Sequence, residues 1–167
     1  MDGFFLILDF IKLKVEINYI YTLLIFFTYL FLHSALSLPG GILFFTASGY
    51  FFGLFIGFLV SIFSLVFGSL FFFVFFSSLI KKIFPLRYKK YSKKINNFIA
   101  DSSFEYLILL RILPGPPLIF QNLLLSMLNI KKNLFCLTAF IGYFPIVFIS
   151  AFAGHQLNNF NSLKSIT

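Results

Sequence analysis

The stretch RILPGPPLIFQN, residues 111–122, places a permanent charge and helix-breaking residues inside an apolar region. Arg111 is always charged, and its planar guanidinium group fits two oxygen atoms of one phosphate. Pro114 and Pro117 would end one helix and begin the next. The helix beginning after Pro117 would point free N–H groups toward the same place, where Asn122 adds an amide. The pattern predicts an anion site suited to a lipid phosphate.

Arg111 also has a purely structural interpretation. It could bind the backbone carbonyl groups that Pro114 and Pro117 release, or pair with Glu105, and so only lock the chain reversal. An unpaired charge inside a membrane costs about 2.5 kcal/mol or more, so either role would relieve a real penalty. The sequence is compatible with phosphate binding, with the structural role, and with both roles together.

The composition excludes a water-soluble globular domain. The chain of 167 residues is 60% hydrophobic and 11% charged, whereas soluble domains have about 25% charged residues. Residues 41–80 contain no Lys, Arg, Asp, Glu or His. About 18 consecutive apolar residues already indicate a membrane span, so we expect an all-α integral membrane protein.

The basic residues are grouped at the edges of the apolar regions. Eleven of the thirteen lie at Lys12 and Lys14, at Lys81 to Lys94, and at Lys131 and Lys132. This grouping is typical of the cytoplasmic loops of membrane proteins and argues against a nucleic-acid partner, despite the net charge of +8. Between about residues 84 and 100, lysines alternate with apolar residues at helical spacing. We expect a basic amphipathic helix there, with the Lys81–Lys94 cluster bound to the membrane surface.

The charge groups and the helix breakers together predict a topology. Residues 17–37 would form an N-terminal transmembrane helix. Residues 38–56 would form a re-entrant hairpin that turns at its glycines, followed by a span at 57–80. Residues 104–130 would form a second re-entrant hairpin, entering from the other side, followed by a span at 133–154. The expected fold is thus two re-entrant helical hairpins, each followed by a transmembrane helix, in an inverted repeat.

This topology divides the chain into three parts. They are residues 1–37, with the first transmembrane helix; residues 38–154, the hairpin-containing membrane domain; and residues 155–167, a short polar tail. We expect a bacterial inner-membrane protein with a cytoplasmic N-terminus and an external tail.

The remaining candidate residues are less specific. Gly49 and Gly53, at the expected tip of the first hairpin, are candidates for the substrate site, with close helix packing as the alternative. His33 and His155 fall at the expected outer ends of spans, where we assign them no function. The sequence shows no Ser-His-Asp set, no metal-ligand cluster and no phosphate-cradling loop. We therefore expect no enzyme activity, no cofactor and no metal.

The same residues resemble a known family. Arg111, Pro114, Pro117 and Asn122 match the Arg-x-x-Pro-x-x-Pro-x-x-x-x-Asn signature of the DedA superfamily, whose shared unit is the VTT or SNARE-associated Golgi protein domain. Further matches are Leu38, Pro39, Gly49, Phe52, Gly53, Gly57, Gly68, Gly142, Pro145 and Gly154. The resemblance covers residues 38–154. The chain departs from the family at Ser126, where a glycine is common, and in having no acidic residue at 38–80, which argues against direct proton coupling there.

The resemblance implies a function in moving lipids. Members of the superfamily are lipid scramblases, or carriers of phospholipid or polyprenyl phosphate. The expected partners are membrane lipids, bound by the phosphate headgroup, and a homo-oligomer is left open. The alternatives are a transporter of a small solute or ion, and a non-transporting membrane scaffold acting through the basic surface helix.

Overall fold

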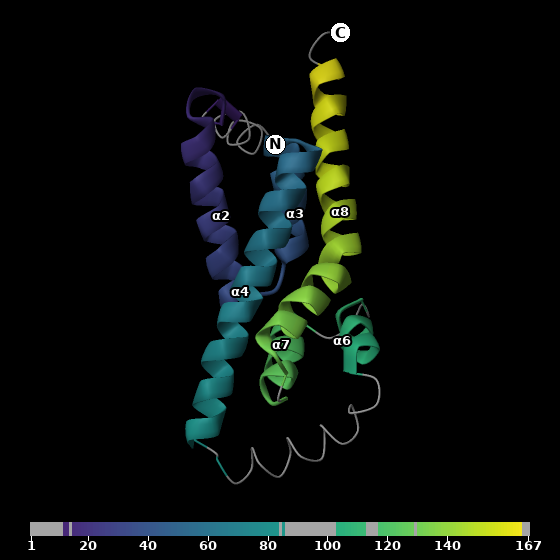
Figure 1. Cartoon of the computed structure of the whole chain (residues 1–167). Coiled ribbons are helices and arrows are strands. Elements are labelled where there is room, and N and C mark those ends of the chain that lie inside the picture. Colours follow the sequence, from purple (N-terminus) through teal and green to yellow (C-terminus); the bar gives the residue numbers. More distant parts are fainter. Residues whose placement is uncertain are drawn as a thin grey trace.

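The computed structural model describes residues 12–13, 15–83, 85, 103–112, 117–128 and 130–164. Its main elements are helices, in the order α2 (Tyr19–Ala35), α3 (Gly41–Phe52), α4 (Leu54–Ile83), α6 (Ser103–Ile112), α7 (Leu118–Ser126) and α8 (Lys132–Lys164) (Figure 1). No strand occurs within the described residues. The expected all-α class is confirmed, whereas the amphipathic helix expected at about 84–100 falls almost entirely outside the described part of the chain.

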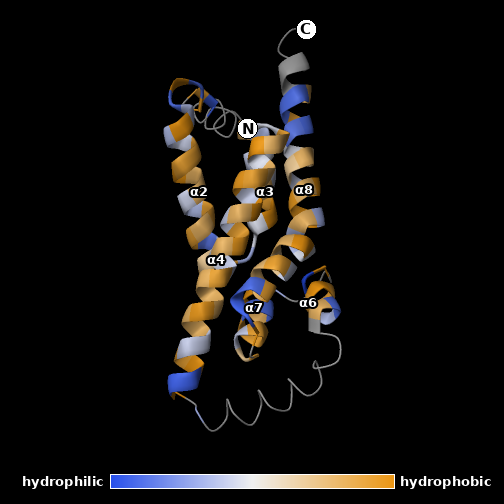
Figure 2. Cartoon of the chain, in the orientation of Figure 1, coloured by the Kyte–Doolittle hydropathy of each residue, from blue (hydrophilic) through white to orange (hydrophobic). Residues whose placement is uncertain are grey.

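Helices α4 and α8 form the long axis of the molecule. Both are long and apolar enough to cross a membrane. The 30 residues of α4 rise about 45 Å, more than the hydrocarbon core of about 30 Å. The two helices run antiparallel, because Phe58 near the start of α4 packs on Phe148, while Phe73 further along stacks on Phe135. Figure 2 shows apolar residues along the middle of both helices and hydrophilic residues at the lower end of α4 and the upper part of α8.

Helices α2 and α3 form an antiparallel pair beside α4. The ring of Tyr19, at the start of α2, lies 5.9 Å from that of Phe52, at the end of α3. His33 and Phe44, near the other ends of the two helices, are 5.0 Å apart. The chain reverses between the pair at residues 36–40, where Ser37 and Gly40 adopt positive φ angles of 52° and 92°.

The first reversal therefore differs from the prediction. Gly49 and Gly57 lie inside α3 and α4, and Gly53 (φ 78°) only separates these two helices. Pro39 and Gly40 break the chain instead, because proline lacks an N–H group and Gly40 adopts a left-handed conformation. The expected position of the first turn is therefore wrong, because the chain reverses at residues 36–40 and not at the glycines. The transmembrane helix expected at 17–37 corresponds to α2, which packs against α3 as one arm of the pair.

Helices α6 and α7, a second and shorter pair of consecutive helices, lie near the other end of α4, where α6 packs on α8 and α7 packs on α4. Leu107 of α6 shares an apolar cluster with Phe73 and Phe135. The end of α6 reaches the middle of α8, where Gly142 admits the side chain of Arg111: a Cβ at position 142 would lie 2.6 Å from that of Arg111. Helix α7 begins directly after Pro117, as predicted. The rest of the expected tip, including Pro114, lies outside the described residues.

The two ends of the described chain lie together. The Nζ atom of Lys12 donates to Oδ1 of Asn158 at 3.2 Å, which places the N-terminal segment beside the last part of α8. Lys81 lies instead with Lys131 and Lys132 at the opposite end. The prediction that the N-terminus and the C-terminal tail face opposite sides is wrong, because α2 and α3 return the chain to the end from which it started.

Candidate functional site

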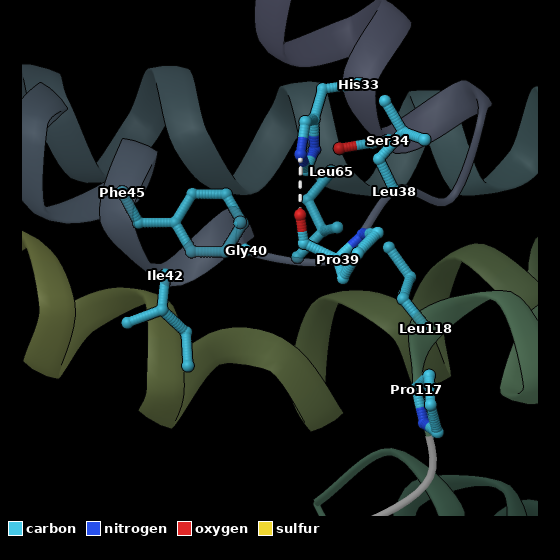
Figure 3. Close-up of a pocket in the computed structure, with 11 residues that line it drawn as sticks. His33, Ser34, Leu38, Pro39, Gly40, Ile42, Phe45, Leu65, Pro117 and Leu118 are labelled. Carbon is cyan, nitrogen blue, oxygen red and sulfur yellow. Dashed lines mark hydrogen bonds between the residues drawn. The ribbon is translucent and has the colours of Figure 1, made fainter.

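The first chain reversal and the start of α7 meet at a cavity of about 360 Å³ (Figure 3). We call it the tip cavity, and it is lined by His33, Ser34, Leu38, Pro39, Gly40, Gly41, Ile42, Phe45, Leu65, Pro117 and Leu118. Only two of these eleven residues, His33 and Ser34, have polar side chains. Leu65 lies eleven residues into α4, about 17 Å from its start. The cavity therefore lies near the middle of the long axis.

His33 lines the tip cavity, a role that the sequence analysis did not predict. Its side chain is buried, and its Nε2 atom lies 3.2 Å from the carbonyl oxygen of Pro39. A carbonyl only accepts, so Nε2 carries a proton and donates it. The expected location of His33 at the outer end of a span is wrong. The sequence did contain one signal for this location, because His33 lies only six residues before the helix breaker Pro39.

Arg111 is buried with its charge facing aromatic rings. The residue is 4% exposed, and its guanidinium carbon lies 4.4 Å from the ring centre of Phe135 and 4.9 Å from that of Tyr143. Its Nε, Nη1 and Nη2 atoms have no hydrogen-bond acceptor among the described residues. The pairing with Glu105, one form of the structural alternative, is therefore not formed, and Glu105 is exposed. Two aromatic faces stabilise the cation, and residues 113–116, which follow it in the sequence, lie outside the described part of the chain.

Two adjacent amides on α7 connect this arginine region to the first chain reversal. The hydroxyl of Tyr143 donates to Oε1 of Gln121 at 3.1 Å. The Nδ2 atom of Asn122 donates to Oγ of Ser37 at 2.9 Å. Asn122 is fully buried, and its Oδ1 atom has no donor among the described residues. Gln121 thus binds Tyr143, whose ring faces Arg111, and the next residue, Asn122, binds the loop at residues 36–40 that borders the tip cavity.

The predicted site residues are only partly brought together. Pro117 lines the tip cavity, and Asn122 lies about one turn away from it. Arg111 lies against the ring of Tyr143, and neither residue lines the cavity. Gly49 and Gly53 are elsewhere. A Cβ at position 49 would fall directly on the backbone of α8, which supports the packing alternative, and Gly53 lies at the α3–α4 turn facing open space.

A family match that covers α3, α4, α6, α7 and most of α8 identifies the family of this chain. The VTT domain family matches residues 38–156. The chain belongs to the VTT-domain family. This confirms the resemblance drawn from Arg111, Pro114, Pro117 and Asn122, and it makes the chain a DedA-type membrane protein with two helices able to cross a membrane.

A curated relative supports the same assignment. This VTT-domain chain is 30% identical over 136 residues to the transmembrane protein 41 homolog of Dictyostelium discoideum. The alignment covers 79% of the chain and 40% of that relative, so the chain spans less than half of the relative's length. No solved structure matches.

The VTT match does not include the whole tip cavity. It begins at residue 38, whereas His33 and Ser34 belong to α2. One wall of the cavity thus comes from a helix that precedes the matched segment. Chemically, the arrangement offers an apolar space near the middle of the long helices. It also offers, outside the lining of that space, a buried cation with no hydrogen-bond acceptor among the described residues.

Proposed function

We propose that this VTT-domain protein moves phosphate-bearing lipids between the two leaflets of a membrane. The observation that carries the proposal is Arg111, a buried charge with three nitrogen atoms lacking an acceptor among the described residues. A charge at the centre of a membrane costs about 2.5–3.5 kcal/mol on insertion scales. A phosphate group would offset much of this cost, because hydrogen bonds to charged groups contribute about 1.5–3 kcal/mol each.

The lining of the tip cavity favours a lipid over a polar solute. A small polar solute needs several hydrogen-bonding groups around it, and this cavity offers the side chains of His33 and Ser34 only. A lipid needs polar contacts for its headgroup alone, since its acyl chains can stay in the bilayer. In the proposed mechanism the headgroup passes the junction of the two helical pairs while Arg111 attracts its phosphate.

The proposed membrane arrangement is an inverted repeat. Helices α2–α4 form one unit and α6–α8 the other, each a short helical pair followed by one long helix. The short pairs act as re-entrant hairpins whose ends meet near the membrane centre, the arrangement by which many transporters build a central site. The positive-inside rule assigns Lys81, Lys131 and Lys132 to the cytoplasmic side. Lys12 then lies outside, which reverses the orientation expected for the N-terminus.

Reconstituted liposomes test the function. Purified protein is inserted into vesicles, and the movement of fluorescent phosphatidylglycerol between leaflets is compared with that of fluorescent ceramide, which has no phosphate. Arg111→Leu should slow phosphatidylglycerol by at least tenfold and affect ceramide far less. Arg111→Lys, which keeps the charge but loses the two-pronged geometry, should fall between Arg111→Leu and the unchanged protein.

Melting temperature in detergent is the control for folding. An Arg111→Leu protein that stays folded and moves phosphatidylglycerol at the original rate would refute the proposal. A loss of stability with the lipid preference unchanged would assign Arg111 to a structural role.

A further inference from the structure

A second cavity, of about 410 Å³, lies at the end of the molecule opposite Lys12. The last turns of α4 and the connection between α7 and α8 enclose it. We call it the basic groove, and it is lined by Phe73, Val74, Ser77, Ser78, Lys81, Leu128, Ile130, Lys131 and Lys132. It is separate from the tip cavity, with which it shares no residue.

The rim of the groove is positively charged. Lys81 comes from the end of α4, Lys132 is the first residue of α8, and Lys131 directly precedes it. All three lysines are exposed, and none of the nine lining residues is acidic. The fold thus brings lysines from distant parts of the sequence to one opening, where an anion would offset their mutual repulsion.

The floor of the groove is apolar. Phe73 and Leu128 are buried there, and Val74 and Ile130 are half-buried. A free inorganic anion gains nothing from such a floor, whereas a lipid has both a charged headgroup and an acyl chain to place. The lysines also stand where the two apolar helices end, which is the level of the lipid headgroups if α4 and α8 span the membrane.

We propose that the basic groove binds an anionic phospholipid. Its phosphate lies between Lys81 and the Lys131–Lys132 pair, and part of an acyl chain lies along Phe73 and Leu128. The site holds a lipid of the leaflet on the basic side, and it does so whether or not the protein moves lipids. It therefore stands independently of the function proposed for Arg111.

Lipid titration followed by native mass spectrometry tests this site. The full chain in neutral detergent is titrated with dioctanoyl-phosphatidylglycerol or with zwitterionic dioctanoyl-phosphatidylcholine. Each lysine near an anionic headgroup contributes about 1 kcal/mol, a factor of about five in affinity. The double variant Lys131→Gln and Lys132→Gln should therefore bind phosphatidylglycerol about 25-fold more weakly. The corresponding arginine variant should bind it as before, because both charges remain.

Lys12→Gln is the matched control, because it removes a lysine from the other end of the molecule. It should change the affinity less than twofold. Equal losses per charge from Lys12→Gln and from the groove variant would overturn the proposal, as would equal affinity for the two lipids. Inorganic phosphate is the last probe. If it displaces the lipid at the lipid's own concentration, the groove is a site for free anions and the lipid assignment is overturned.

Discussion

The hydrogen bond between Asn122 and Ser37 joins the two helical pairs, and its strength can be measured directly. Both side chains are buried, and their Nδ2 and Oγ atoms are 2.9 Å apart. Such a bond contributes about 0.5–1.5 kcal/mol net, and a buried group left without a partner costs about 1–3 kcal/mol. Asn122→Ala and Ser37→Ala should each lower the free energy of unfolding by about 1–3 kcal/mol. The double variant should lose about 1.5 kcal/mol less than the sum, because the second change removes a group already unpaired.

Unfolding in mixed micelles with increasing dodecyl sulfate gives these free energies. The chain has no tryptophan, so far-UV circular dichroism is the appropriate signal. Ser150→Ala is the control, since Ser150 is also buried but bonds within its own helix, to the carbonyl oxygen of Ile146. The loss of unfolding free energy from Ser150→Ala should simply add to the loss from Asn122→Ala. If the losses from Asn122→Ala and Ser37→Ala are also additive within about 0.3 kcal/mol, this bond does not couple the two pairs.

Two further predictions concern packing and topology. Gly49→Ala should destabilise the protein by at least about 1–3 kcal/mol, since its new methyl group must displace the backbone at Ala151; an unchanged melting temperature would contradict the close α3–α8 contact. With Cys136 replaced by serine, single cysteines at Lys12 and Lys131 should react with an impermeant thiol reagent from opposite sides of sealed vesicles. Labelling of both positions from the same side would contradict the proposed crossing by α8.

Strong local signals in the sequence predicted part of this structure. The long uncharged run at residues 41–80 requires an apolar helix, and α4 covers most of it. Pro117 starts α7 because its ring is compatible with the beginning of a helix but not with its interior. Arg111 was expected to be buried because the residues around it are apolar, and it is.

The first chain reversal could not be located in the same way. Two sets of breakers compete there, Pro39 with Gly40 and the series Gly49, Gly53 and Gly57. A glycine looks the same in a sequence whether it turns the chain or admits a neighbouring helix. Only the tertiary contacts show that Gly49 serves packing against α8. The misplaced turn also hid the position of His33 and separated the N-terminal segment from the end of α8, beside which Lys12 lies.

The folding unit begins earlier in the sequence than the family match, because α2 packs against the matched segment but precedes residue 38. A shortened protein containing only residues 38–156 would keep every residue of the VTT match but lose α2. The surface of α4 at Gly68, which the backbone of α2 covers closely, would then be open, and lipid chains would fill the space. The tip cavity would lose His33, Ser34 and one wall. In such a fragment the tip cavity would become a notch that is also open on the side that α2 now covers.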